Sequence, residues 1–299
     1  MPFQSDHLRT LLALVDEGTF EAAARRLHLT QSAVSQRVKA MEHEAGSVLV
    51  RRTTPVTTTD AGDVLLRYAR QVQLLDADAV RALSHADEAR GTTLVPLALN
   101  ADTLATWFLP SVADAVHELG LTLDLRREDQ DRTTRLLRDG TVLAAVTSTA
   151  EPVQGCSSVP LGAMRYHAVC SPAFARRHLD GDDLTPLGRA PRLDFDRQDD
   201  LQRTFVRDVV GSGDAGPRHF VPTSPDFARA VVLGLGWGLL PEEQCLADVR
   251  ARRLVDLAPR HAVDVALWWQ RWNLSSPLLD RLTDAVVAGA ATHLRRVAP

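Results

Sequence analysis

Residues 19–41, TFEAAARRLHLTQSAVSQRVKAM, have the apolar spacing of two short helices separated by a turn. In the first helix the apolar positions are Phe20, Ala23, Ala24 and Leu27. In the second, which Thr30 can cap, they are Val34, Val38 and Met41. At about 100° per residue, the face opposite these three presents Ser32, Ser35, Gln36 and Lys39. Short polar and basic side chains suit base edges and phosphates in a major groove, so the stretch predicts a helix-turn-helix that binds DNA; an ordinary amphipathic helix pair is the alternative.

A short hairpin is predicted directly after the second helix, which ends near Gly46. Residues 48–52 and 57–59 are predicted strands, and residues 53–55 form the turn between them. A hairpin in this position is called a wing. Its two arginines are placed where they would touch the phosphate backbone of DNA. The segment from Arg25 to Arg52 has six basic and two acidic residues, although the whole chain has a net charge of −4. The predicted DNA-binding residues are Thr30, Gln31, Ser32, Ser35, Gln36, Arg37, Lys39, Arg51, Arg52 and Thr53.

Composition limits the class of protein. A length of 299 residues predicts two or three domains, and 45% hydrophobic residues suffice for buried cores. The three cysteines, Cys156, Cys170 and Cys245, are far apart and have no metal-binding or CxxC spacing, which is typical of a reducing compartment. The N-terminus has no signal-peptide pattern and no run of about 18 apolar residues occurs, so we expect a cytoplasmic protein without a membrane span.

A long helix is predicted from Asp60 to about Ala89, because this segment has no proline and its one glycine falls in the first turn. Apolar residues recur in it at alternating spacings of four and three: Ala61, Leu65, Tyr68, Val72, Leu75, Ala79, Ala82 and Ala86. This heptad seam favours a dimerising linker helix. The same periodicity would also suit a helix that packs on its own domain.

Beyond residue 93, predicted strands alternate with predicted helices, which indicates an α/β fold. The strands are expected at 94–99, 121–125, 142–147, 164–170, 192–195, 218–222, 237–240 and 263–270, and the helices at 104–118, 132–138, 172–179, 199–208, 225–234 and 276–294. Glycine and proline within residues 155–163 predict a boundary between two subdomains. The segment GLGWG at 234–238 follows a helix and precedes a strand, the reverse of a dinucleotide-binding motif, so we interpret it as helix termination.

The order of these elements resembles that of the LysR-type transcriptional regulators over essentially the whole chain. Residues 30–42, TQSAVSQRVKAME, match the recognition-helix signature of that family well. Residues 100–107, NADTLATW, and 128–131, EDQD, resemble its ArgP/LysG group, whose members sense lysine or arginine and drive a basic amino-acid exporter. The region around the wing is richer in arginine and threonine than in that group, which leaves the operator preference open.

The resemblance implies a winged helix-turn-helix at residues 1–59, a dimerising linker helix at 60–91, and a two-lobed α/β effector domain like that of periplasmic binding proteins. Lobe one would comprise residues 92–162 with 268–299, and lobe two residues 163–267. The effector, L-lysine or L-arginine, would lie between the lobes, and neither a cofactor nor a metal is expected. The expected partners are double-stranded promoter DNA, RNA polymerase and a second copy of the chain in a homodimer or a tetramer.

The effector candidates follow from the groups of a basic amino acid, which needs donors for its carboxylate and acceptors for its cations. The turn after strand 94–99 opens a helix whose first N–H groups suit an anion, although Asp102 or Thr103 could simply cap that helix. Glu128, Asp129 and Asp131 follow a strand end, where α/β sheets bind ligands, but flanking arginines could neutralise them. The predicted effector-binding residues are Asn100, Asp102, Thr103, Glu128, Asp129, Asp131, Thr147, Asp194, Asp196 and Ser224.

Two other classes of function compete with this interpretation. An enzyme is disfavoured because the sequence has no Ser/His/Asp arrangement, phosphate-binding loop or metal-ligand spacing. An architectural or replication-inhibiting DNA-binding protein, without ligand-gated promoter control, is the stronger rival. We therefore predict a sequence-specific transcriptional regulator that responds to a small basic amino acid and is not an enzyme.

Overall fold

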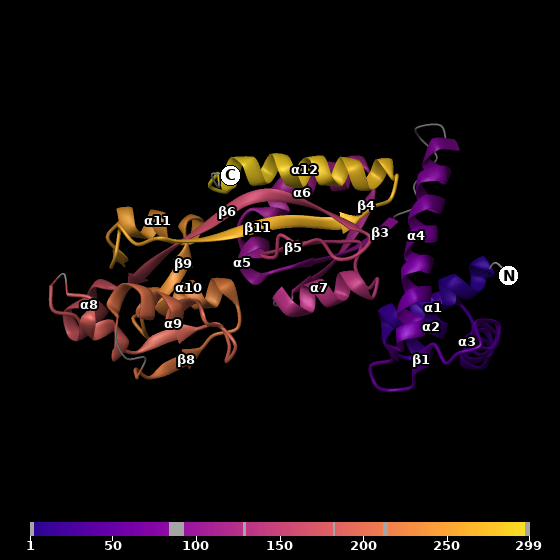
Figure 1. The fold of residues 1–299 in the computed structure, drawn as a ribbon, viewed down its shortest axis with the longest axis horizontal. Coiled ribbons are helices and arrows are strands. Elements are labelled where there is room, and N and C mark those ends of the chain that lie inside the picture. The colour runs from indigo at the N-terminus through magenta and orange to yellow at the C-terminus, as the bar shows by residue number, and fades with distance from the viewer. Residues whose placement is uncertain (1–2, 84–92, 128–129, 182, 212–214, 297–299) are drawn as a thin grey trace. The chain divides into compact units, whose positions relative to one another are not determined.

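The computed structural model of the chain describes residues 3–83, 93–127, 130–181, 183–211 and 215–296 (Figure 1). The chain forms two compact units. Unit one comprises residues 1–99, 113–159 and 269–285, and unit two comprises residues 100–112, 160–268 and 286–299. The division into a DNA-binding domain, a linker helix and two lobes at the boundaries given above stays a prediction.

Three helices open unit one: α1 (Ser5–Glu17), α2 (Phe20–Leu27) and α3 (Gln31–Ala45). Gly18 ends α1 in the left-handed conformation, which glycine adopts without steric cost. The side chains of Thr19 and Thr30 accept hydrogen bonds from the Ala22 and Ala33 N–H groups and so begin α2 and α3. The predicted apolar face of α3 is fully buried against α1 and α2, which confirms the helix-turn-helix.

The predicted wing is a hairpin of two short antiparallel strands, β1 (Val50–Arg51) and β2 (Thr57–Thr58). A side chain of α3 holds it in place, because Glu42 Oε1 accepts hydrogen bonds from the N–H groups of Leu49 at 3.0 Å and Val50 at 3.4 Å. The hairpin therefore has a defined position relative to the recognition helix.

The long helix α4 (Asp60–Leu83) follows the wing. Leu65, Leu66 and Ala69 are buried in the core that α1, α2 and α3 form, and Ala61 and Val72 pack against that core in part. Other seam positions are exposed: the side chains of Tyr68 and Leu75 have 43% and 45% of their surface in solvent. The predicted seam is thus divided between the protein's own core and solvent; Ala86 lies outside the described residues.

The part of unit one beyond α4 is built on three parallel strands. β3 (Thr93–Leu99) lies between β4 (Leu121–Arg127) and β5 (Ala144–Thr147). The same part of unit one contains α7 (Gln130–Arg138), the C-terminal part of α6 (Phe108–Glu118) and the N-terminal part of α12 (Pro277–His293) (Figure 1). We expected one helix over 104–118, but the chain forms α5 (Ala101–Ala105) and then α6. Pro110 explains the interruption, because a proline is tolerated in the first turn of a helix and not in its interior.

Unit two is organised around β6 (Cys156–Cys170), which pairs antiparallel with β9 (Gly238–Pro241) and β10 (Val255–Asp256). The change from unit one to unit two, between Val159 and Pro160, falls within the segment 155–163 where a boundary was predicted, although β6 continues through it with Gly162 at φ +128. β6 and β11 (Val263–Trp272) are the long strands that pass from one unit into the other.

The remaining elements of unit two are a second, two-stranded parallel sheet and several short helices. They are β7 (Arg192–Asp194) and β8 (Arg218–Phe220), with α8 (Pro172–His178), a 3-10 helix (Thr185–Gly188), α9 (Leu201–Phe205), a π-helical turn (Val206–Val210), α10 (Ser224–Val232) and α11 (Glu242–Arg250). The helix α11 and the strand β10 were not predicted. Among the described helices, none combines the length and the apolar character needed to cross a membrane.

Candidate DNA-binding and effector-binding sites

The outward face of α3 has the polar composition that the sequence predicts. Gln31, Ser32, Gln36 and Lys39 are exposed, and Ser35 is half-buried. Thr30 accepts the Ala33 N–H group at 3.2 Å, so its hydroxyl serves as the N-cap of this helix. The exposed donors and acceptors lie on the face opposite Val34, Val38 and Met41, which are fully buried. This face therefore has the size and chemistry of a major-groove recognition surface.

The wing arginines make contacts within the N-terminal helical region. The guanidinium carbon of Arg52 lies 5.0 Å from the centroid of the Phe20 ring, and its Nη2 donates to Ser35 Oγ at 3.4 Å. Arg51 Nη1 donates to the Thr58 carbonyl at 2.6 Å across the hairpin, and the Thr53 hydroxyl donates to the Pro55 carbonyl at 2.6 Å. Both arginines remain exposed, so their positive charges are available to phosphates.

Arg37 differs from the other predicted DNA-binding residues because it faces α1. Its Nη2 lies 3.2 Å from Asp6 Oδ2, and its Nη1 donates to Thr10 Oγ1 at 3.3 Å. These contacts anchor the recognition helix to the first helix. They favour a positioning role for Arg37 over a direct contact with DNA.

The start of α5 shows which residue caps it. Asn100 Oδ1 accepts the Thr103 N–H group at 2.7 Å, so the N-cap is Asn100 and not Asp102 or Thr103, the two residues that the sequence suggested for this role. The Thr103 side chain is fully buried, and its Oγ1 has no hydrogen-bond partner within the described part of the chain. The cap leaves the carboxylate of Asp102 available for other interactions.

Asp102 is the centre of a polar cluster within unit two. The Tyr166 hydroxyl on β6 donates to Asp102 Oδ2 at 2.8 Å, and the side chain of Ser224 on α10 also hydrogen-bonds to Asp102. Gln244 Nε2 on α11 donates to Ser224 Oγ at 2.9 Å. Burial raises the pKa of Asp102 above its usual range, although the hydrogen bonds from Ser224 and Tyr166 lower it in part. A carboxylate in these surroundings would gain stability from a cationic ligand.

Sequence reasoning selected Asp102 and Ser224 but missed Tyr166 and Gln244. Tyr166 lies within a long strand, and Gln244 lies in the helix α11, which was not predicted. No local motif marks either residue. Their role is visible only in the tertiary structure, where Tyr166 on β6 contacts Asp102 and Gln244 on α11 contacts Ser224.

The structure does not place the other candidates in this cluster. Asp194 is fully buried, where it accepts a hydrogen bond from Arg192 Nε at 3.0 Å and pairs with Arg218, which favours a structural role. Asp196 Oδ1 accepts the N–H groups of Gln198 and Asp199, as in a polar turn.

The remaining candidates lie in unit one or outside the described residues. Thr147 belongs to unit one, where its hydroxyl donates to the Thr149 carbonyl at 3.0 Å. Glu128 and Asp129 lie outside the described residues, as does the side chain of Asp131. Their predicted contacts with an effector stay predictions.

Comparison with known proteins gives this architecture its family. A model of the lysR family of bacterial regulatory helix-turn-helix proteins matches residues 5–63, and a model of the LysR substrate binding domain matches residues 97–291. The chain belongs to the LysR family. This LysR-family protein is 45% identical over 291 residues to the lysine export transcriptional regulatory protein LysG of Corynebacterium efficiens, with 97% of this chain and 98% of the relative covered.

Two solved structures resemble the LysR-family chain over nearly its full length. The crystal structure of ArgP from Mycobacterium tuberculosis has a TM-score of 0.83 and 41% sequence identity, and the match covers 97% of this chain and 98% of that one. Full-length LysG from Corynebacterium glutamicum with bound effector Arg has a TM-score of 0.75 and 41% identity, with 98% and 99% covered. The family and these relatives show a DNA-binding transcriptional regulator with an effector domain, not an enzyme.

Proposed function

We propose that this LysR-family regulator controls promoter binding in response to L-lysine or L-arginine, and that Asp102 binds a cationic group of that effector. The observation that supports the proposal is the Asp102 cluster, in which a carboxylate with a raised pKa is held by Tyr166 and Ser224. The bound Arg of the similar LysG structure supports the same class of ligand.

The chemistry of the cluster favours an ammonium or guanidinium group as its ligand. Burial disfavours the charged carboxylate, and a bound cation offsets that cost by direct charge pairing. A carboxylate has about four lone-pair sites and Tyr166 and Ser224 supply two donors, so Asp102 keeps acceptor capacity for a ligand. The acidic residues Glu128, Asp129 and Asp131 remain our candidates for a second cationic group.

A direct test combines calorimetry with footprinting on the full chain. We expect L-lysine or L-arginine to bind and to change the protection of one defined promoter site, whereas neutral amino acids should do neither. A ligand present at ~100 times its dissociation constant should also stabilise the protein by ~2.7 kcal/mol. Diffuse DNA coverage that no amino acid alters would instead support the architectural alternative.

The recognition face predicts a specific mutational result. Gln36→Ala should weaken binding to the operator by about 1–3 kcal/mol and relax specificity at the base pair that Gln36 contacts. Lys39→Ala is the contrasting variant, because the loss of a phosphate contact should weaken binding to all sequences about equally and reduce the salt dependence. Gel-shift titrations on operator and random DNA distinguish the two. Unchanged operator affinity of Gln36→Ala would show that another face of α3 contacts the bases.

We also propose that α4 dimerises two copies of the chain, and that two such dimers form a tetramer that contacts RNA polymerase at the promoter. The exposed apolar side chains on one face of α4 support this, since Val64, Tyr68 and Leu75 each have 43–58% of their surface in solvent. Helical residues three, four or seven positions apart share a face, as in a coiled-coil seam. Val72, another position of the predicted seam, packs against the core of the winged helix and is therefore unsuited to a disruptive charge.

Leu75→Glu is therefore the informative variant for dimerisation. A charge at this exposed apolar position should dissociate dimers without disturbing the core of the DNA-binding domain. Sedimentation velocity would show the change in mass. Gln73→Glu is the control, because it introduces the same charge on the side of α4 that borders α1. An intact Leu75→Glu dimer would exclude this face of α4 as the dimer seam.

A further inference from the structure

One face of α4 contacts the ends of three helices in the α/β part of unit one. Arg67 Nη1 donates at 2.9 Å to the carbonyl of Arg138, the last residue of α7. Arg81 Nη1 donates at 2.6 Å to the carbonyl of Leu119, just beyond the end of α6. Asp78 Oδ1 accepts the N–H group of Leu278 at 3.3 Å, in the first turn of α12.

The charge of each side chain is opposite to that of the helix end it contacts. The C-terminal end of a helix has a partial negative charge and the N-terminal end a partial positive charge. The two arginines accordingly lie at C-terminal ends, and the aspartate lies at an N-terminal end. Because Pro277 has no N–H group, Leu278 supplies the first amide donor of α12, which otherwise lacks an intrahelical partner.

The two surfaces also approach each other closely. Gly140 has φ +76, and a Cβ added there would lie 2.2 Å from Arg67 Cγ and 2.7 Å from Arg67 Cα. The guanidinium carbon of Arg67 lies 5.6 Å from the ring centroid of Trp272 on β11. Residue 140 must therefore be small for α4 to lie in this position.

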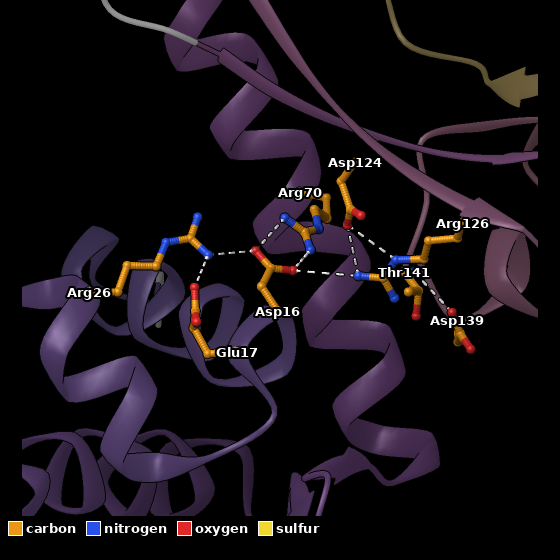
Figure 2. A network of polar contacts seen from close by, with 8 residues as sticks. All are labelled: Asp16, Glu17, Arg26, Arg70, Asp124, Arg126, Asp139 and Thr141. Carbon is orange, nitrogen blue, oxygen red and sulfur yellow. Dashed lines mark hydrogen bonds and ion pairs between the residues drawn. The ribbon is translucent and has the colours of Figure 1, made fainter.

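A second contact joins the winged helix to the same part of unit one. Asp16, at the end of α1, pairs with Arg70 of α4, and both side chains are buried (Figure 2). Arg126 Nη2 on β4 lies 3.9 Å from Asp16 Oδ1 and 3.1 Å from Asp124 Oδ2. Asp16 is thus shared by a guanidinium of the linker helix and one of β4.

We propose that these contacts form one docking surface, on which the effector domain holds the linker helix and with it the DNA-binding domain. The charged residues of α4 that are involved are Arg67, Arg70, Asp78 and Arg81, and their spacings of three, eight and three place them on one face of the helix. This docking face is distinct from the exposed row of Val64, Tyr68 and Leu75. Release or retention of α4 would then transmit the state of the effector domain to DNA. Only this regulatory consequence rests on the proposed function.

Hydrogen exchange of the full chain tests the docking without any effector. Gly140→Ala should displace α4 and raise amide exchange in the first turn of α12, residues 277–282, roughly fivefold or more, although the substitution is far from that turn in sequence. Gly46→Ala is the matched control, because Gly46 also follows a helix at positive φ, +64, but a Cβ there meets nothing within 4 Å and the residue takes no part in the docking contacts. Asp78→Ala should raise exchange in the same turn, whereas Asp76→Ala, an exposed neighbour, should not.

The regulatory consequence has a separate measurement. In Gly140→Ala, calorimetry should show wild-type affinity for lysine or arginine, while the effector-dependent change in operator affinity should be lost. Folded Gly140→Ala with wild-type exchange at residues 277–282 would overturn the docking proposal. If the wild-type chain bound neither amino acid, the proposed function would fail while the exchange result still decided whether α4 docks.

Discussion

Asp102→Asn is expected to lower the affinity for lysine or arginine at least tenfold. The substitution keeps the shape of the side chain but removes the charge that pairs with the ligand's cation. Leaving one member of a buried charge pair unpaired typically costs 2–5 kcal/mol, and ~1.4 kcal/mol corresponds to one decade in affinity. Operator binding without effector should persist, because α3 and the wing lie outside unit two. Calorimetry and gel shifts on the same preparation measure both quantities.

The pH dependence of binding supplies an internal check on this result. Because burial raises the pKa of Asp102, the carboxylate takes up a proton at a higher pH than an ordinary aspartate. Affinity should therefore be fully present above that pKa and decrease as pH falls through it, and Asp102→Asn should remove this step. Asp226→Asn, an exposed position two residues after Ser224, is the matched control. Wild-type affinity in Asp102→Asn would exclude Asp102 from the effector site.

Asp16→Ala should destabilise the DNA-binding domain by about 3–5 kcal/mol, the usual cost of breaking a buried ion pair from one side. Arg70, with only 2% of its side chain exposed, would keep its charge in the interior without a carboxylate partner. Arg26 and Arg126 would lose the same partner (Figure 2).

The control for this prediction is Glu17→Ala. Glu17 is the next residue, is exposed and shares only the contact with Arg26. Urea unfolding of the full chain, followed by hydrogen exchange in α1 and α4, measures the difference between the two variants. Equal midpoints for Asp16→Ala and the wild type would mean that the ion pair adds little to stability.

The N-terminal fold was predictable because its signals are local. Gly18 and Gly46 end helices, Thr19 and Thr30 begin them, and the apolar spacing gives the buried face of α3. The α/β region was predictable at the level of alternating strands and helices. Its irregularities were not: Pro110 divides a predicted helix, and β6 continues through a proline and a glycine because strand pairing outweighs their local preferences.

The candidate effector site was only half predictable for the same reason. Asp102 and Ser224 lie at helix starts that follow strands, a position visible in the sequence. Tyr166 and Gln244 reach Asp102 or Ser224 only through tertiary structure, and Asp194 is neutralised by arginines that no spacing rule identifies. A carboxylate that is already paired with arginines, such as Asp194, is structural, and only the tertiary structure shows this pairing.

One side of α4 packs in the core of the DNA-binding domain, another contacts the effector part, and a third is exposed. This arrangement limits how domains of this regulator can be exchanged with those of other regulators. A chimaera joined before Asp60 would strip the winged helix of Leu65 and Leu66, which complete its interior. A chimaera joined after Leu83 would leave the ends of α6, α7 and α12 facing a foreign helix without matching charges. A working biosensor would therefore have to transplant Arg67, Asp78 and Arg81 into the incoming linker at the same helical spacing. The DNA-binding domain and the effector domain are therefore not independent modules, because both depend on side chains of α4.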